Sequence, residues 1–468
     1  MGGPLGEAEL PLTLDRNGPG PLAAQLADQL RKAILAGVIR PDHTLPATRR
    51  MASELGISRG VVVRAFEQLA GEGFLESHGA GGTRVVIRPD VQRPVLKKPP
   101  IPHMQDSRPI IDLTPGRPSG IPFKNREWHT AWRKAVSEQG PTHLPPPLGT
   151  DTLRKAIVGH LAVSRGLAVQ PDDVIITAGT SDALQLAVAA LRSRREHPRI
   201  LVEDPGYPTA RRVMAAAGAV LETVTVDEDG LKVSQLATLE RLPDAVLITP
   251  SHQYPLGGRM PVQERLGLLN WAAKHSVLVL EDDYDSEFRH SRMPLPAVAS
   301  LPSTADVALL GTFSKSLSPW LRCGYLVVRG ESGHALKAMR EDLDTPVPGI
   351  MQSALAHYIQ AGGLARHITR ARREYAHRRA LLLERLGARA DLRLAALDGG
   401  LHVVLRFQGK DALQLANEAL RRGVRMATLD AYYADREPEN GLVIGYGAPS
   451  DLQLIKALDI IAELLEGP

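Results

Sequence analysis

The sequence has only one cysteine, Cys323, which excludes an intramolecular disulfide. It has no apolar run near the ~20 residues that a membrane-spanning helix requires. Residues 1–14 also lack the basic and then apolar order of a signal peptide. These absences predict a cytoplasmic protein without a membrane-spanning segment.

Net charge is also small: +4 over 468 residues does not by itself indicate a nucleic-acid partner. This charge is unevenly placed, because residues 40–98 hold ten Lys or Arg against six Asp or Glu and so carry +4 alone. A solvated surface explains such a cluster as well as a DNA-binding surface does. The length leaves room for a small domain and one or two larger ones, so the assignment depends on local motifs.

Three short helices are expected near the start of the chain. Pro21 opens the first, and Gly37 and Pro41 end it. Gly56 stops the second, and Ser58 is placed to cap the third. Their apolar faces are Leu22, Leu26, Leu30, Ile34 and Leu35; Met51, Ala52 and Leu55; and Val61, Val62, Ala65, Phe66 and Leu69. Two short helices joined by a glycine turn are typical of a helix-turn-helix.

A glycine-rich hairpin is expected over residues 73–87 and would form the wing of a winged helix-turn-helix. The same elements are compatible with a module for protein contacts, or with an unrelated small helical domain. Three motifs favour DNA binding: Leu-Pro-x-x-Arg ending at Arg49, Leu-Gly-x-Ser-Arg ending at Arg59, and Glu-Gly-Phe ending at Phe74. Together they closely resemble the GntR family of bacterial repressors.

The resemblance implies a DNA-binding domain over residues 1–88, with double-stranded operator DNA as its partner. The positions that match DNA-contacting residues of the family are Arg49, Ser58, Arg59, Gly60, His78 and Gly79. The chain departs from the family at Val61, Val62 and Val63, where relatives often carry polar residues. Part of the recognition helix is therefore expected to contact thymine methyl groups.

Residues 89–110 are rich in proline, which disfavours helix and predicts an extended, semi-rigid linker. The alternative is an ordered strap on one of the domains. From residue 111 to 468, short β-rich runs alternate with helical stretches, which predicts an α/β domain with a mostly parallel sheet. The runs are residues 174–177, 200–202, 245–248, 277–280 and 308–310. A smaller C-terminal subdomain is expected from about residue 345 to 468.

Ligands of such sheets bind past the C-terminal ends of the strands, where this chain places a set of reactive side chains. Lys315 can form a Schiff base with the aldehyde of pyridoxal 5'-phosphate (PLP), and Asp282 can pair with its pyridine nitrogen. Tyr207 can stack on the ring, while Tyr284 and the segment that contains Gln253 can reach the ring oxygen. The candidates for holding the phosphate are Gly179, Thr180, Ser181, Thr312, Ser314 and Arg322. Each is a weak signal alone, and their order along five strand ends carries the prediction.

This order resembles the fold-type I, aspartate-aminotransferase-like family. The segments Ser-His-Gln at 251–253, Glu-Asp-Asp-Tyr at 281–284 and Gly-Thr-Phe-Ser-Lys-Ser at 311–316, behind a GntR-like head, resemble the MocR/GabR subfamily of transcription regulators. The resemblance covers nearly the whole chain. It implies a head-to-tail, domain-swapped homodimer that binds PLP and regulates genes of amine or vitamin B6 metabolism.

The chain departs from the aminotransferase pattern in three places. Val443 stands where aminotransferases carry the arginine that fixes the substrate carboxylate. Residues 144–148 lack a tyrosine that many relatives place near the phosphate, and Thr209 occupies a position where amine-responsive regulators can have an arginine. These departures weaken two ideas, efficient transamination and sensing of an ordinary amino acid.

The leading hypothesis is a regulator that senses PLP itself, as PdxR-type members do, and controls vitamin B6 synthesis. A second hypothesis is that PLP is a fixed cofactor and an amine or amino acid is the signal. A third is a working aminotransferase with a DNA-binding head, which Lys315 and Asp282 permit and Val443 opposes. A scaffold without PLP is disfavoured by the intact lysine. We expect no catalytic role and no metal site.

Overall fold

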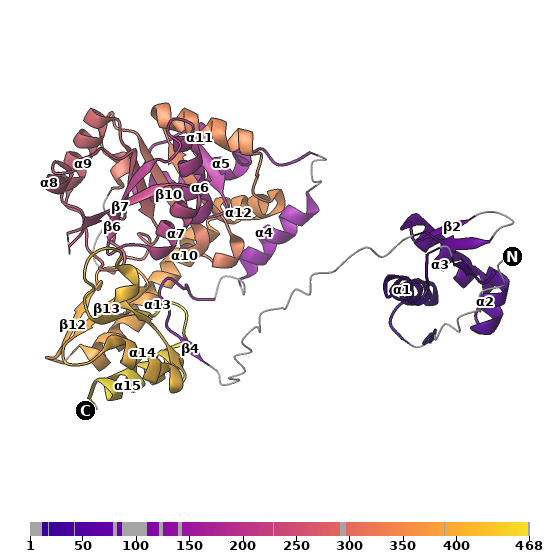
Figure 1. Ribbon diagram of the computed structural model, residues 1–468. Coiled ribbons are helices and arrows are strands. Elements are labelled where there is room, and N and C mark those ends of the chain that lie inside the picture. The colour runs from indigo at the N-terminus through magenta and orange to yellow at the C-terminus, as the bar shows by residue number, and fades with distance from the viewer. Residues whose placement is uncertain are drawn as a thin grey trace. The chain divides into compact units, whose positions relative to one another are not determined.

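A computed structural model describes residues 12–16, 18–41, 43–77, 82–86, 110–120, 125–138, 143–227, 229–290, 296–387 and 389–466. The described residues fall into two compact units, one within residues 1–105 and the other within residues 106–468 (Figure 1). The expected linker, except for its last residue, lies outside the described ranges. No helix in the described ranges is long and apolar enough to cross a membrane.

The N-terminal unit contains three helices and a small antiparallel sheet (Figure 1). Its elements are α1 (Leu22–Leu35), β1 (Thr44–Leu45), α2 (Thr48–Glu54), α3 (Arg59–Gly71), β2 (Leu75–Ser77) and β3 (Thr83–Val85), with strand order β1-β3-β2. Gly56, at φ +61°, forms the left-handed turn between α2 and α3 that favours glycine. The predicted helix-turn-helix with a wing is therefore confirmed.

Packing in this unit follows the expected apolar faces with one exception. Leu26, Leu30 and Ile34 of α1 are buried against α3. Leu35 was expected on the same face but is 42% exposed. Successive helical residues are rotated by about 100° from each other, so Ile34 and Leu35 do not both face the core.

The second unit is organised around a seven-stranded sheet of order β5-β11-β10-β9-β8-β6-β7. All its strands are parallel except β11, which is antiparallel to both neighbours. The strands are β5 (Val174–Thr177), β6 (Arg199–Asp204), β7 (Val220–Thr225), β8 (Ala245–Ile248), β9 (Leu278–Asp283), β10 (Val307–Thr312) and β11 (Gly324–Val328). The five predicted runs are all strands, and the mostly parallel α/β sheet is confirmed.

Helices surround this sheet (Figure 1). They are α4 (Arg126–Ser137), α5 (Asp151–Arg165), α6 (Thr180–Arg192), α7 (Pro208–Ala216), α8 (Val233–Leu236), α9 (Val262–His275), α10 (Phe313–Ser316), α11 (Gly330–Leu343) and α12 (Gly349–Gln360). The apolar faces of α6, α7 and α11 pack with β6, β8, β9 and β10 in one core cluster. Helix α12 packs on α4 and α5, although its residues follow the expected start of the C-terminal subdomain.

A second, smaller sheet has the order β12-β13-β16-β15. Its strands are β12 (Leu392–Ala395), β13 (His402–Phe407), β15 (Ala427–Thr428) and β16 (Gly441–Gly445), accompanied by α13 (Gly363–Leu386), α14 (Ala412–Arg421) and α15 (Asp451–Glu466). A separate pair joins distant parts of the chain, because β4 (Ile111–Asp112) runs parallel to β14 (Val424–Arg425). The first strand after the linker is thereby anchored on the C-terminal part.

Candidate functional site

A cavity of about 470 Å³ lies at the C-terminal ends of β9 and β10. Nine of the residues predicted to hold PLP line it: Thr180, Ser181, Tyr207, Asp282, Tyr284, Thr312, Ser314, Lys315 and Arg322. They come from the C-terminal ends of β5, β6, β9 and β10 and, for Arg322, from the turn just before β11. The parallel order of the strands brings these distant segments together.

Lys315 lies in the short helix α10, directly after β10. The Thr312 side chain accepts a hydrogen bond from the Ser314 backbone N–H at 3.1 Å and fixes this turn. The Lys315 Nζ donates to the carbonyl oxygen of Gly116 at 2.5 Å. Burial lowers the pKa of Lys315, whereas the Asp282 carboxylate acts to raise it. A lowered lysine pKa favours the neutral amine, which is the nucleophilic form.

Asp282, near the end of β9, is only 4% exposed. Burial, and then the neighbouring Asp283, raise the pKa of Asp282 to about 7. Its Oδ1 atom is buried and has no hydrogen-bond partner among the described residues. A buried carboxylate oxygen requires a donor, and the N–H of a protonated pyridine ring would supply one. This chemistry fits the nitrogen end of PLP.

Groups that suit an anion are found where α6 begins. Gly179 has φ +91° and lets the chain turn from β5 into α6, whose first residues are Thr180 and Ser181. A Cβ atom placed on Gly179 would lie 3.7 Å from Nη1 of Arg322. Backbone amides at a helix N-terminus, hydroxyl groups and a guanidinium form a suitable site for a phosphate.

Four tyrosines form the aromatic part of the cavity: Tyr207, Tyr254, Tyr284 and Tyr432. Tyr254 lies edge-on to the other three, with ring centroids 5.7, 5.3 and 5.4 Å from Tyr207, Tyr284 and Tyr432. The Tyr284 hydroxyl lies 2.9 Å from Nδ1 of His252, which also contacts Oδ2 of Asp285 at 2.9 Å. Burial raises the pKa of Tyr284 well above its ordinary value, so the hydroxyl is a neutral donor.

Gln253 corrects the sequence analysis. It is 1% exposed and is not among the residues that line the cavity. Its Nε2 donates to the carbonyl oxygens of Pro205 and Tyr254 at 2.8 and 2.9 Å, and its Oε1 accepts from the Leu256 N–H at 3.1 Å. Since its amide is already bonded on both sides, Gln253 supports the loop and is not placed to bind the ring oxygen.

Val443 lies in β16, fully buried in an apolar cluster with Val404, Leu429 and Tyr432. No side chain of this strand lines the cavity. With valine in place of arginine at position 443, strand β16 has no side chain that could bind the carboxylate of a ligand in the cavity.

Other cavity residues were missed by the sequence analysis. Tyr254 belongs to the segment that contains Gln253, which the sequence analysis placed near the ring oxygen without singling out this tyrosine. Gly116 and Tyr432 come from the two ends of the second unit, and no local pattern places them beside Lys315. Apart from Thr209, which the sequence analysis named only as a departure from the family, the missed residues are Thr114, Pro115, Gly116, Pro208, Arg212, Thr249, Tyr254, Pro319, Ala431 and Tyr432.

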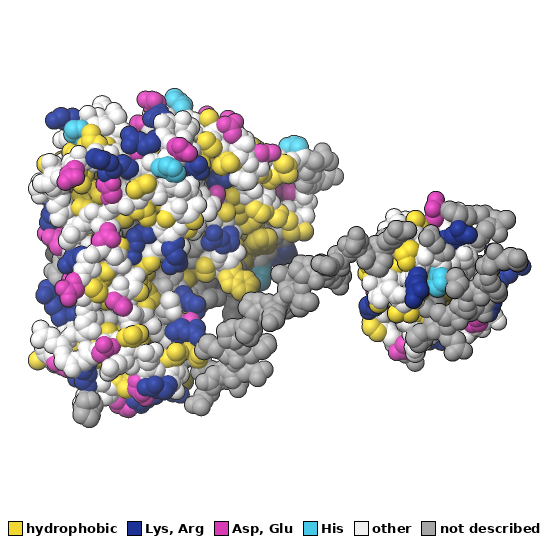
Figure 2. Space-filling model, viewed as in Figure 1, with side chains coloured by type: hydrophobic (Ala, Val, Ile, Leu, Met, Phe, Trp, Pro, Cys, Tyr) yellow, Lys and Arg dark blue, Asp and Glu magenta, His cyan; other side chains and the backbone are white. Residues whose placement is uncertain are grey.

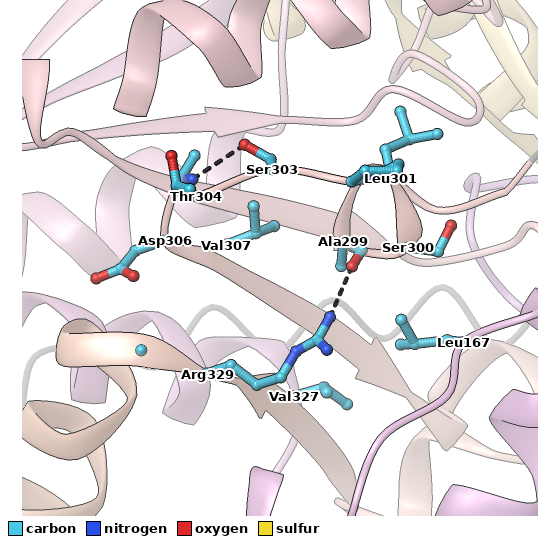
Figure 3. Close-up of a pocket in the computed structure, with 13 residues that line it drawn as sticks. Leu167, Ala299, Ser300, Leu301, Ser303, Thr304, Asp306, Val307, Val327 and Arg329 are labelled. Carbon is cyan, nitrogen blue, oxygen red and sulfur yellow. Dashed lines mark hydrogen bonds between the residues drawn. The ribbon is translucent and has the colours of Figure 1, made fainter. Parts of the chain in front are cut away.

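A second cavity of about 490 Å³ lies near the start of β10, away from Lys315 (Figure 3). Its lining combines backbone with Ser303, Thr304 and Asp306, and Arg329 donates to the carbonyl oxygen of Ala299 at 3.2 Å. The Asp306 carboxylate accepts from the Ser332 N–H at 2.8 Å. With its charged groups bonded in this way, the second cavity offers less reactive chemistry than the Lys315 cavity.

In the N-terminal unit, Arg49 of α2 and Ser58, Arg59 and Gly60 at the start of α3 are exposed. Arg59 Nε lies 3.4 Å from the Thr48 hydroxyl, so the two helices present these side chains together. Ser58 occupies the N-cap position, but its side chain makes no capping hydrogen bond. His78 and Gly79 lie outside the described residues.

The expectation for the valine run of α3 is wrong in part. Val62 is fully buried in the core, so it is not available to a thymine methyl group. Val61 and Val63 are partly exposed, so both remain available for contact with thymine methyl groups.

Figure 2 shows Lys and Arg interspersed with Asp and Glu over the visible face of the second unit.

Comparisons with known proteins agree with the two units. A model of the gntR family of bacterial regulatory proteins matches residues 22–85, and a model of class I and II aminotransferases, a PLP-binding fold, matches residues 109–444. The HTH-type pyridoxine biosynthesis transcriptional regulator PdxR of Corynebacterium glutamicum is 38% identical over 445 residues, 94% of this chain and 95% of that protein. The probable rhizopine catabolism regulatory protein MocR of Rhizobium meliloti is 32% identical over 456 residues, 93% of this chain and 92% of that protein.

A solved structure shows the fold of the second unit. An archaeal alanine:glyoxylate aminotransferase matches with a TM-score of 0.70 and 23% identity, over 77% of this chain and 91% of that chain.

Proposed function

Because the chain belongs to the MocR-type GntR regulators, which join a helix-turn-helix to an aminotransferase domain, we propose that it binds PLP at Lys315 and uses it as the signal that controls transcription. The genes proposed as targets are those of vitamin B6 synthesis. The name of the Corynebacterium relative, which shares 38% of its residues with this chain, supports that assignment.

The observation that carries the proposal is the placement of Lys315 and Asp282 in one cavity with a phosphate-type site. When bound, PLP supplies an aldehyde for Lys315 and an electron-accepting ring. Asp282, with its unpartnered Oδ1, would hold the ring nitrogen. Thr180, Ser181 and Arg322 would hold the phosphate, and Tyr207 would cover a ring face. Thr312, Ser314 and Gly179 would shape the phosphate end, and Tyr284 would donate to the ring oxygen.

The proposal assigns sensing, and not turnover, to the aminotransferase domain. Efficient transamination requires a fixed substrate carboxylate, and the strand that contains Val443 offers no group for it. An effector shifts two states of a protein only if it binds them unequally. A ligand that contacts residues 114–116 after β4, Lys315 after β10 of the large sheet and Tyr432 in the C-terminal part can meet this requirement.

We expect PLP to change operator affinity. The operator is first obtained by selection of bound duplexes from a random pool. Binding is then measured for PLP-free and PLP-loaded protein by fluorescence anisotropy at fixed salt, because phosphate contacts make affinity depend on salt. Amino acids are added afterwards to both forms. Equal affinity of the two forms, with a response only to an amine, would show that the amine is the signal.

We also expect a head-to-tail, domain-swapped homodimer that recognises two half-sites. A single small winged helix binds DNA weakly, and paired heads gain affinity through linkage. Sedimentation at micromolar concentration with PLP present measures the mass directly. A monomer under these conditions would contradict the proposed assembly and the two-half-site operator.

A further inference from the structure

His252 and Asp285 form a buried pair that contacts Tyr284 but does not line the Lys315 cavity. The two residues are 6% and 2% exposed. Nδ1 of His252 lies 2.9 Å from Oδ2 of Asp285 and 2.9 Å from the Tyr284 hydroxyl. The proposed function gives Tyr284 a role at the ring oxygen of PLP and leaves the pair beside it without one.

The position of one hydrogen decides where the Tyr284 hydroxyl donates. A carboxylate only accepts hydrogen bonds, so the contact with Asp285 places the imidazole hydrogen of His252 on Nδ1. An Nδ1 that carries a hydrogen cannot accept one from Tyr284. Burial, and then the charge of Asp285, raises the pKa of Tyr284, so Asp285 also attracts the hydroxyl hydrogen. By occupying Asp285, His252 leaves that hydrogen free to point into the cavity that Tyr284 lines.

A separate cavity of about 10 Å³ is lined by His252 and Asp285, and it suits this tautomer. Buried polar atoms require partners, and a cavity of this size accommodates about one water molecule. A water molecule can donate to an Nε2 that carries no hydrogen. Four atoms of the residues that line this cavity are buried and have no hydrogen-bond partner among the described residues: Nε2 of His252, Oγ of Ser251, Oγ of Ser286 and Nη1 of Arg289.

The backbone at Gly400 holds the pair in place. Gly400 has φ +75°, and a Cβ atom placed on it would clash with Oδ2 of Asp285 and lie 2.7 Å from Cε1 of His252. Its carbonyl oxygen accepts a hydrogen bond from the Tyr446 hydroxyl at 2.9 Å. A residue with a side chain at this position would therefore displace the pair from Tyr284.

Other charged and titratable groups surround the pair without replacing Asp285. Asp285 is the carboxylate that the described part of the chain places in hydrogen-bond contact with His252. Burial lowers the pKa of His290 and of His402 to about 4, so both are neutral at pH 7. The groups that line the small cavity or act on the pair through their charge are Arg259, Arg289, Asp398, His290, His402 and Lys315.

We propose that His252 is a positioning residue for PLP, which donates from Nδ1 to Asp285 and thereby directs the Tyr284 hydroxyl at the ring oxygen. The inference rests on the proposed binding of PLP at Lys315. The ring oxygen carries most negative charge when the nitrogen that joins Lys315 to PLP has lost its proton. A hydrogen bond to a charged group favours the charged form, so Tyr284 lowers the pH at which this nitrogen loses its proton. His252 therefore acts on the charge of the bound PLP without touching it.

The test is a pH titration of the absorbance of Lys315-bound PLP in the full-length protein. His252→Gln should raise the midpoint by about one unit, because the variant has no donor at the place of Nδ1 and Asp285 takes the Tyr284 hydrogen. Tyr284→Phe should raise the midpoint by about one unit or more. The double variant should match Tyr284→Phe within about 0.3 unit, because His252 acts through Tyr284.

Further variants separate positioning from a merely structural effect. His252→Asn has an amide nitrogen that can take the place of Nδ1, so its midpoint should stay within about half a unit of the wild type. His290→Gln is the matched control, because this neighbouring histidine contacts the Tyr446 hydroxyl at 3.0 Å, and it should leave the midpoint unchanged. If His252→Gln does not fold, Gly400→Ala displaces the pair without removing a polar group and should raise the midpoint only where Tyr284 is present.

The outcomes distinguish this inference from the proposed function. An unchanged midpoint in His252→Gln, or an equal rise in His252→Asn or His290→Gln, would overturn the inference. A rise that persists in full in the Tyr284→Phe background, or an unchanged midpoint in Tyr284→Phe itself, would overturn it as well. In each of these cases the Lys315-dependent absorbance remains, and the proposed binding of PLP stands. A wild type without that absorbance would refute the proposed function, and this inference with it.

Discussion

Lys315→Ala should abolish the absorbance band, near the edge of the visible range, that PLP acquires when it is bonded to a lysine. Alanine has no amine to form the Schiff base, so the loss should be complete. Borohydride treatment should remove the same band from the wild type, because it reduces the double bond. The measurement is an absorbance spectrum after incubation with PLP and removal of the excess.

A matched control is available for this variant. Lys274 is an exposed lysine of α9, outside the residues that line the cavity, and Lys274→Ala should keep the wild-type spectrum. Identical spectra for the wild type and Lys315→Ala would show that another amine binds the aldehyde. Such a result would remove the lysine assignment, while the family and the fold would stand.

Arg59→Ala should weaken operator binding by roughly 1–3 kcal/mol and relax selectivity at one base position, because an arginine at the start of a recognition helix reaches base edges in the major groove. The structure exposes Arg59 there, beside Thr48. Arg49→Ala should weaken all sequences alike and lower the salt slope by about one, as expected for a phosphate contact.

Both arginines are tested by anisotropy against the selected operator and single-base variants over a range of salt. Lys32→Ala in α1, with a side chain 74% exposed and paired with Asp28, controls for the loss of a positive charge in the same unit. Operator binding that is unaffected by both Arg49→Ala and Arg59→Ala would rule out this surface as the DNA contact.

The sequence predicted the elements whose pattern is local. Apolar runs in fully buried strands such as β5 and β8 are continuous, and they were found at their observed bounds. Strand β7 was missed because it is an edge strand that mixes exposed and partly buried residues. The antiparallel strand β11 was missed since only the four-residue helix α10 and one further helical turn separate it from β10, so no long helical pattern marks where it begins.

Prediction of the site residues likewise depended on whether their sequence pattern is local. Lys315, Asp282 and Arg322 could be predicted because reactive side chains at strand ends converge in a parallel sheet. Gln253 could not be judged, because only the folded loop shows that its amide is bonded to Pro205 and Leu256. Gly116 reaches Lys315 across 199 residues of sequence, and such long-range pairs have no local pattern.

The pairing of β4 with β14 has a consequence for how such regulators exchange their heads. The residues after β4 form one wall of the cavity, and the Gly116 carbonyl meets Lys315. A gene fusion joined after residue 116 would therefore remove a strand and the lysine's partner together with the old head. Recombination that swaps DNA-binding modules is compatible with an intact cavity only if the junction falls before Ile111, which leaves the proline-rich stretch as the permissive point of exchange.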